Sequence, residues 1–331
     1  VLVKCFYLIT IKMTKIKLTK IKEILSLPLN DLIFKAQAVH KKSFPKLDIQ
    51  LASLLSIKTG SCPEDCKYCP QSAHYNVELK KEKLINIELV KSAAKKAKEN
   101  GAERFCMGAA WKKLRDGGDL ETIINMIKEV KSLNLEACVT LGSISKKQAV
   151  ALKKAGLDAY NHNIDTSPEF YKEIISTRTF EERLDTIKNV QRAGISVCSG
   201  GIIGMGESWH DRARMIEVLA NLSPQPESIP INSLVPVEGT PLEDMKKVDS
   251  FEMVRIIAAI RIILPKSRIR LSAGRKDLTK EAQLLCFIVG ANSIFYGDTL
   301  LTTDNNDMKG DKELIAHYKE SAMDIINSNE L

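Results

Sequence analysis

Three thiols at Cys62, Cys66 and Cys69 follow the spacing Cys-x3-Cys-x2-Cys. Thiolates are soft ligands that suit zinc, copper(I) or iron–sulfur clusters. Three close cysteines without a fourth can hold three irons of a [4Fe–4S] cube and leave one iron open to a small molecule. A structural zinc site completed by His74 is the alternative. The apolar run at 51–57 and the lack of a second Cys-x2-Cys pair favour the iron–sulfur interpretation.

Three further cysteines, Cys106, Cys138 and Cys198, fall on segments that we predict to be strands. Any one of them alone is interpreted as a small buried hydrophobic residue, as is Cys286 in its apolar helical run. On neighbouring strands of a barrel, however, the three would point into a common interior, where one more donor could complete a [2Fe–2S] cluster. The seventh predicted strand offers Arg270 instead, and a guanidinium is not expected as a ligand from its chemistry alone, because it stays protonated.

The fourth predicted strand contains a row of polar residues. Because side chains alternate along a strand, Asn161, Asn163 and Asp165 share one face and His162 lies on the other. Two amides and a carboxylate make a poor core but a good site for a ligand with donors and acceptors, such as a cyclic urea. Asn232, at the end of the sixth predicted strand, can join them, whereas His162 is interpreted as a hydrogen-bonded packing residue.

These residues need a scaffold, and the chain alternates short β-type runs with longer amphipathic segments. Gly101, Gly156 and Gly194 each end a helical segment where a left-handed residue is expected. The pattern predicts an α/β fold, a (β/α)8 barrel of the TIM type, with its chemistry at the carboxyl ends of the strands. A doubly wound open sheet is the alternative, but no glycine-rich dinucleotide fingerprint follows the first strand. The expected strands are 51–58, 103–108, 135–140, 157–162, 195–201, 227–232, 268–272 and 292–296. The expected helices are 86–99, 119–133, 145–155, 180–193, 209–222, 250–264, 279–289 and 311–327.

The domain organisation predicted from the sequence is simple. We expect residues 1–45 to form an N-terminal helical extension, with Asn30 or Asp31 as the N-cap of a leading helix. Residues 46–331 contain no low-complexity linker, and we expect them to form one barrel domain with a short C-terminal tail.

Composition excludes several function classes. The 331 residues are 44% hydrophobic, as in ordinary globular proteins, and the net charge is +8. The first 50 residues carry ten lysines and three acids, so the basic excess lies in a leader and nucleic-acid binding is not expected. Residues 1–12 are too short and too basic for a signal peptide, and we expect translation to start at Met13, which leaves Cys5 without a function. The cysteine usage suits a reducing cytoplasm, and no run approaches the length of a membrane span.

The aromatic Tyr68 just before the third cysteine makes the motif resemble the signature of the radical S-adenosylmethionine (SAM) enzymes. The longer string at 56–72, SIKTGSCPEDCKYCPQS, resembles one family within them, the biotin synthases. The resemblance spans about residues 30–326. It departs from the family in the first dozen residues and at His74, where an arginine is common.

The resemblance implies roles for the residues that it covers. Cysteines would hold both clusters, with one arginine in the second: Cys62, Cys66 and Cys69 for [4Fe–4S]; Cys106, Cys138, Cys198 and Arg270 for [2Fe–2S]. The implied SAM contacts are Tyr68, Ala109, Asn163, Asp165, Arg183, Ile202 and Glu207. The implied substrate contacts are Asn161, Asn163 and Asn232.

Several of these SAM contacts have an alternative without function. Ile202 and Glu207 match a G-x-I-x-G-x-x-E pattern used near the adenine, although its glycines alone can simply turn the chain. Ala109 matches a loop whose backbone meets the methionyl amine. Arg183 could equally be an exposed helical arginine, and the same caution applies to Tyr68.

The resemblance implies sulfur insertion between two unactivated carbons of dethiobiotin. SAM would be cleaved reductively to methionine and a 5′-deoxyadenosyl radical, which abstracts hydrogen, and a sulfide of the [2Fe–2S] cluster would be consumed. The implied partners are a flavodoxin-type or ferredoxin-type electron donor, iron–sulfur assembly machinery and a second copy of the chain in a cytoplasmic homodimer.

Two other functions stay open. Another radical SAM enzyme would keep Cys62, Cys66 and Cys69 but would not need the three strand cysteines, and lipoyl synthase would need an additional N-terminal cysteine motif that this sequence lacks. A non-catalytic iron–sulfur electron carrier would need neither an open iron nor the row at 161–165.

Overall fold

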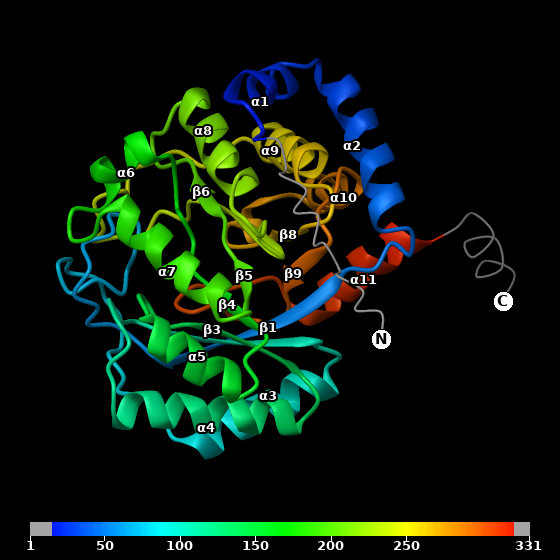
Figure 1. Cartoon of the computed structure of the whole chain (residues 1–331). Helices are drawn as coiled ribbons and strands as arrows, with labels where there is room; N and C mark the ends of the chain where they lie inside the picture. Colours follow the sequence, from blue (N-terminus) through cyan, green and yellow to red (C-terminus); the bar gives the residue numbers. More distant parts are fainter. Residues whose placement is uncertain (1–14, 321–331) are drawn as a thin grey trace, which may run out of the picture.

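The computed structural model describes residues 15–320, which form a closed parallel barrel (Figure 1). Its strands are β1 Gln50–Lys58, β2 Arg104–Ala109, β3 Glu136–Thr140, β4 Ala159–Asn161, β5 Ser196–Cys198, β6 Gly201–Ile203, β7 Ser228–Ser233, β8 Arg268–Leu271 and β9 Ser293–Phe295. They follow the order β5-β4-β3-β2-β1-β9-β8-β7-β6, and β5 also pairs with β7. Because β5 and β6 lie one after the other beside β7, they share one of eight barrel positions. The predicted barrel is therefore confirmed.

Helices cover the outside of the barrel (Figure 1). Their bounds are α1 Leu18–Leu25, α2 Leu29–Ser43, α3 Ile87–Glu99, α4 Gly118–Ser132, α5 Lys146–Lys154, α6 Pro168–Ile174, α7 Phe180–Arg192, α8 Trp209–Ala220, α9 Ser250–Ile263, the 3-10 turn η1 Arg275–Asp277, α10 Lys280–Ile288 and α11 Met308–Lys319. Ser145, Thr179 and Ser208 form capping boxes that fix where α5, α7 and α8 begin. The three predicted helix-ending glycines have φ of +94°, +98° and +72°, which confirms the left-handed conformation.

The N-terminal segment differs from its prediction. It forms two helices, α1 packed against α8 and α2 packed against α9. Pro28 occupies the N-cap position of α2, so Asn30 and Asp31 lie in its first turn and the predicted N-cap was wrong. Pro28 explains the break, because a proline disfavours the helical conformation of the residue before it. Cys5 and the predicted end of the last helix, 321–327, lie outside the described residues.

The predicted strand 195–201 is two strands, β5 and β6, separated at Gly200. The carbonyl of Gly200 accepts hydrogen bonds from the backbone amides of Ile164 and Asp165, at 3.0 and 3.3 Å, so the strand leaves its regular ladder here. A Cβ at position 200 would lie 1.9 Å from the carbonyl oxygen of Pro230, so only glycine fits. The interruption brings this strand against the polar row that follows β4.

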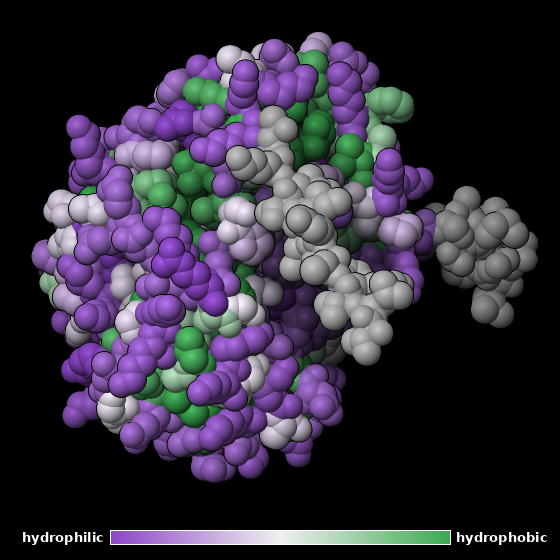
Figure 2. Space-filling model, in the orientation of Figure 1, coloured by the Kyte–Doolittle hydropathy of each residue, from purple (hydrophilic) through white to green (hydrophobic). Residues whose placement is uncertain are grey.

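The outer face shown in Figure 2 is mainly hydrophilic, with small separate hydrophobic areas. Apolar side chains from the strands and the inward faces of the helices fill the space between the two layers. Among residues 15–320, none of the helices is long and apolar enough to cross a bilayer. A small second cluster inside the barrel contains Cys106, Cys138, Ala52 and Ala159.

Candidate active site

A cavity of about 330 Å³ opens inside the barrel, within the size range of small-molecule sites. It receives side chains from β1–β4 and β6–β9 and from the loops that follow several of them. Both predicted cysteine sets reach it, together with the polar row and the arginine of β8. Of the predicted residues, those that line it are Tyr68, Cys69, Cys106, Cys138, Asn161, Asn163, Asp165, Ile202, Asn232 and Arg270.

The first cysteine set lies on the loop after β1. Cys66 is 8% exposed, Cys62 and Cys69 are partly exposed, and none of the three is in a disulfide. Burial raises the pKa of all three thiols, to about 11 for Cys69. Without a metal they are therefore neutral at neutral pH, and a bound metal would have to displace their protons.

The second set lies deeper. Cys106 on β2 and Cys138 on β3 are paired in the strand register, and the guanidinium of Arg270 on β8 lies 3.9 Å from the sulfur of Cys198 on β5. All three cysteines are free and buried. Neighbouring strands thus bring the three thiols and Arg270 into the barrel interior, as predicted.

Two guanidinium groups make this interior unusual. Arg270 is 1% exposed and its partners are neutral: it donates to Ser293 Oγ at 3.0 Å and to Gln50 Oε1 at 3.3 Å. A hydrogen bond from Cys138 lowers the pKa of Cys106 despite burial, and Arg270 and Arg104 lower it further. The same hydrogen bond raises the pKa of Cys138, and burial raises the pKa of Cys198 although Arg270 and Arg104 oppose it. Negative charge is therefore favoured on Cys106, and a bound cluster would have to displace the protons of Cys138 and Cys198.

The polar row behaves as the alternation predicted. The amide of Asn161 donates to Thr140 Oγ1 at 3.0 Å, and Asn163 Oδ1 accepts from the Gly200 amide at 3.1 Å. Both asparagines line the cavity. His162 is buried on the other face, but its Nε2 has no hydrogen-bond partner in the described structure, so the expectation that it is fully hydrogen-bonded was wrong.

Arg183 is buried rather than exposed, which excludes its alternative as a surface residue of α7. Its guanidinium donates to the carbonyl of Asn163 at 2.9 Å and to the hydroxyl of Tyr171 at 2.5 Å. Its Nη2 also lies 2.7 Å from Asp165 Oδ2, as an ion pair without the alignment of a hydrogen bond. Asp165 Oδ2 is therefore a buried acceptor with no aligned donor among residues 15–320, on a side chain that lines the cavity. It is suited to a ligand that carries N–H or O–H groups.

Like Arg183, the predicted SAM contacts Glu207 and Ala109 lie outside the cavity lining. Glu207 is buried outside the cavity lining, and its carboxylate accepts from the amides of Gly204 and Met205 and pairs with Arg212 at 2.8 Å. It holds the glycine-rich loop that follows Ile202, which does line the cavity. Ala109 ends β2 and is buried outside the lining.

Asn232 lines the cavity but is also tied to the backbone. Its Nδ2 donates to the carbonyl of Gly201 at 3.1 Å, and its Oδ1 accepts from the amide of Ala273 at 3.2 Å. It thus joins β7 to β6 and to the loop after β8, with one lone pair and one N–H left for a ligand.

The loop between β9 and α11 also reaches the cavity, which was not predicted from the sequence. Leu300, Leu301, Thr302 and Thr303 line the cavity, and Leu301 packs against Gly108 of β2. This loop carries no recognisable motif. The one signal that could have identified it is its place after a barrel strand, since such loops surround the sites of these folds.

The zinc alternative can be compared with the positions of its four predicted ligands. Within the described chain, no three His, Cys, Asp or Glu side chains are close enough together to bind one metal ion. His74, the fourth ligand of the zinc alternative, is exposed, and its Nε2 lies 3.2 Å from the carbonyl of Pro63. The geometry therefore does not favour zinc.

The chain also matches known protein families over most of its length. Residues 56–219 match the radical SAM superfamily, and residues 230–319 match the biotin and thiamin synthesis associated domain. The chain is 55% identical to biotin synthase of Synechococcus elongatus over 311 residues, which is 94% of this chain and 97% of the relative. It is 58% identical to biotin synthase of Prochlorococcus marinus over 297 residues, covering 90% of this chain and 86% of that one.

Solved structures with lower identity show the same fold. The crystal structure of methylornithine synthase matches with a TM-score of 0.77 at 19% identity, over 96% of this chain and 97% of that one. The FeFe-hydrogenase maturase from Carboxydothermus hydrogenoformans also matches with a TM-score of 0.77 at 19% identity, over 92% of this chain and 75% of that one. The shared fold, the matched domains and the identity to the relatives together show that this chain belongs to the biotin synthase family of the radical SAM superfamily.

Proposed function

We propose that the cavity is where this enzyme of the biotin synthase family converts dethiobiotin to biotin, with the residues of both cysteine sets in the roles predicted above. One observation carries the proposal: a single cavity is lined by Cys69 of the first set and by Cys106, Cys138 and Arg270 of the second. The asparagines of the polar row line the same cavity. A substrate held there would lie within reach of both sets.

Cys62, Cys66 and Cys69 would hold a [4Fe–4S] cluster, and Cys106, Cys138, Cys198 and Arg270 would hold a [2Fe–2S] cluster. When bound, these groups supply the electron that cleaves SAM and the sulfur that enters the product. The protein's part is to place the reactants in line and to exclude water from a radical reaction. The closed barrel wall and the loop that carries Leu300 and Leu301 provide this enclosure.

Ligand contacts follow from the free donors and acceptors of the cavity. Asp165 Oδ2 would accept from SAM, and the buried Arg183 holds Asp165 and Asn163 in place for it. Asn161 and Asn232 would bind the cyclic urea of dethiobiotin, because amides offer both donors and acceptors. The hydroxyls of Thr302 and Thr303 would donate to its carboxylate end.

The test is anaerobic conversion of dethiobiotin to biotin by the reconstituted chain with SAM and a reductant. Cys138→Ala should keep SAM cleavage but form no biotin, because only the second set is damaged. Cys286→Ala is the matched control: this free cysteine is equally buried but lies in α10, outside the cavity lining. Biotin formation by Cys138→Ala at the wild-type rate would contradict the assignment of the second set.

The remaining partners follow from family membership. We infer a flavodoxin-type or ferredoxin-type electron donor, iron–sulfur assembly machinery that rebuilds the consumed cluster, a homodimer and a cytoplasmic location. We further infer the division into residues 1–45 and 46–331 as extension and catalytic domain. Size-exclusion chromatography with light scattering tests the dimer, and reduction by a purified flavodoxin tests the donor.

A further inference from the structure

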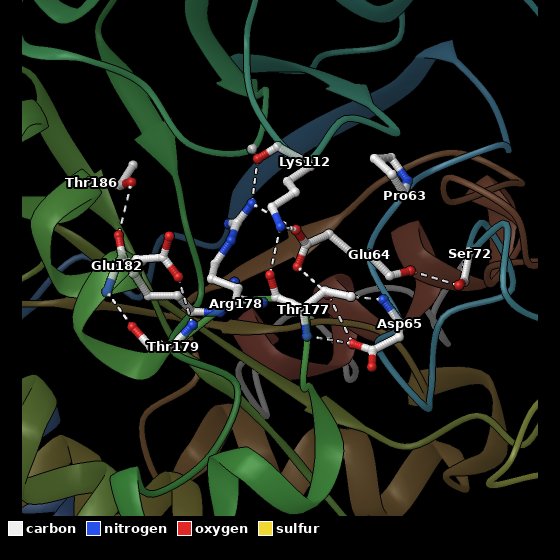
Figure 3. Close-up of polar contacts among 12 residues, drawn as sticks. Pro63, Glu64, Asp65, Ser72, Lys112, Thr177, Arg178, Thr179, Glu182 and Thr186 are labelled. Carbon is white, nitrogen blue, oxygen red and sulfur yellow. Dashed lines mark hydrogen bonds and ion pairs between the residues drawn. The ribbon is translucent and has the colours of Figure 1, made fainter.

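The loop after β1 that carries Cys62, Cys66 and Cys69 is called the iron–sulfur loop here. Two acids, Glu64 and Asp65, lie between its first two cysteines, and neither of them lines the cavity. The carboxylate of Asp65 accepts hydrogen bonds from the amides of Ser176 and Thr177, at 2.9 and 3.1 Å, and from the hydroxyl of Thr177 at 2.8 Å. The Ser176 hydroxyl also donates to it. Asp65 therefore binds a segment 111 residues further along the chain, between α6 and α7 (Figure 3).

Glu64 extends these contacts to a third loop. Its buried carboxylate lies 3.4 Å from Nη2 of Arg178 and 3.5 Å from Nζ of Lys112, in the loop after β2. Arg178 in turn donates to the carbonyl of Lys112, and Nζ of Lys112 donates to the carbonyl of Thr177 at 2.6 Å (Figure 3). The iron–sulfur loop, the loop after β2 and the segment before α7 are thus joined by one network.

The backbone of the two acids is held as well. The amide of Asp65 donates to Thr177 Oγ1 at 3.1 Å, and its carbonyl accepts from the hydroxyl of Tyr75. The carbonyl of Glu64 accepts from Ser72 Oγ at 2.6 Å. Although partial burial opposes it, hydrogen bonding by Ser176 and Thr177 holds the pKa of Asp65 far below its usual range. The contacts use the protein's own groups only, so they exist without iron.

The segment held by Asp65 leads directly to the SAM contacts. Thr179 is the N-cap of α7, and its capping box with Glu182 fixes the first turn of that helix. Arg183 follows in the same turn and reaches Asn163 and Asp165 of the cavity. Only one helical turn therefore separates the network from the side chains that face the ligand.

We propose that Asp65, supported by Glu64, is a positioning residue that clamps the iron–sulfur loop to the start of α7 and so fixes Cys62, Cys66 and Cys69 relative to Arg183 and Asp165. The proposal rests on the proposed function, in which SAM contacts the cluster on the three cysteines and the side chain of Asp165 at the same time. The clamp fixes the distance between the three cysteines and the start of α7 before SAM binds, so SAM binding does not have to order the two loops.

The first test needs no iron. Hydrogen–deuterium exchange on the full-length, iron-free protein compares wild type with Asp65→Ala and Thr177→Val. The second variant keeps the shape of the side chain but loses the hydroxyl, which lies 2.8 Å from the carboxylate of Asp65 and 3.0 Å from that of Glu64. Exchange at 60–72 and 174–179 should speed up about 10- to 100-fold, because each variant removes several hydrogen bonds, some of them to a charged group. Asp158→Ala is the control: its carboxylate also joins two segments, through the Ala137 amide at 2.8 Å, but outside the cavity lining. Unchanged exchange in both test variants would overturn the proposal.

The second test separates positioning from general stability. After reconstitution, Asp65→Ala and Thr177→Val should hold as much [4Fe–4S] cluster as wild type, yet show a KM for SAM raised about tenfold and a smaller change in the electron paramagnetic resonance signal on adding SAM. Asp65→Asn, which keeps an acceptor for the two amides, should lie between them and wild type. Wild-type SAM affinity and signals in Asp65→Ala and Thr177→Val would refute the clamp. Failure of the wild-type protein itself to cleave SAM would refute the proposed function instead. The exchange experiment would still test the contact between the two loops, because it uses iron-free protein.

Discussion

Replacing Arg270 by methionine distinguishes a cluster ligand from a structural residue. Arg270 is 1% exposed and, within residues 15–320, forms no ion pair with a carboxylate. Burying an unpaired cation costs several kcal/mol. Its bonds to Ser293 and Gln50 return about 1.5–3 kcal/mol each, and its position 4.8 Å from the centre of the Phe295 ring returns about 0.5–2 kcal/mol, so the two sides nearly cancel. We therefore expect the iron-free Arg270→Met protein to unfold within about 1 kcal/mol of wild type.

The control is Arg261→Met, another fully buried arginine. Its guanidinium donates to the carbonyls of Gly290, Pro265 and Ser267, at 2.6–3.2 Å. Removing it leaves several buried acceptors unsatisfied at about 1–3 kcal/mol each, so this variant should lose at least about 3 kcal/mol. Both are measured by anaerobic urea unfolding of the iron-free proteins, followed by circular dichroism.

After reconstitution, Arg270→Met should lose the [2Fe–2S] absorbance and keep the [4Fe–4S] absorbance. If the iron-free Arg270→Met protein is as unstable as Arg261→Met, Arg270 is a structural residue, and its contacts stabilise the fold by more than its burial costs.

Three other outcomes are expected. Gly108→Ala would place a Cβ 2.6 Å from Leu301 Cδ2, so the loop over the cavity must shift, and dethiobiotin binding should weaken about 3- to 10-fold in a calorimetric titration with cluster content unchanged. Asn232→Ala removes the proposed urea contact and two backbone bonds and should weaken the same binding about 10-fold or more; unchanged affinity would remove Asn232 from the proposed site. Burial, helped by Arg261, lowers the pKa of His40 from 6.5 to about 4. Between these two pH values the unfolded chain binds a proton at His40 and the folded protein does not, so the free energy of unfolding should fall as the pH drops from about 6.5 to about 4. His40→Gln should remove about 2 kcal/mol of that fall, and an identical pH profile would show that His40 is not responsible.

The barrel and its cysteines could be predicted because their signals are local. Periodicity and helix-ending glycines such as Gly156 mark each β/α unit, and strand alternation places Asn161, Asn163 and Asp165 on one face. Closure of the barrel then brings Cys198 and Arg270 together across 72 positions of sequence. Here a topological rule replaced the missing long-range information.

The remaining features depend on partners that no local pattern reveals. In the sequence, Asp65 is only a residue between Cys62 and Cys66, and its role becomes visible when Ser176 and Thr177 fold against it. Glu207 matches a ligand-contact pattern, yet Arg212 and two backbone amides use its carboxylate. Leu301 lies in a loop without a motif, and only the space above Gly108 makes it a wall of the cavity.

If one barrel holds two clusters around one substrate, an anaerobic count of iron and sulfide together with a Mössbauer spectrum should detect both clusters. We expect about six irons per chain, divided between a [4Fe–4S] and a [2Fe–2S] signature. In Cys106→Ala the [2Fe–2S] signature should disappear and about four irons should remain. A count of about four irons in the wild-type protein would contradict the presence of a second cluster. Alkylation after unfolding must then show that Cys106, Cys138 and Cys198 are reduced thiols, because oxidised cysteines could not hold a cluster.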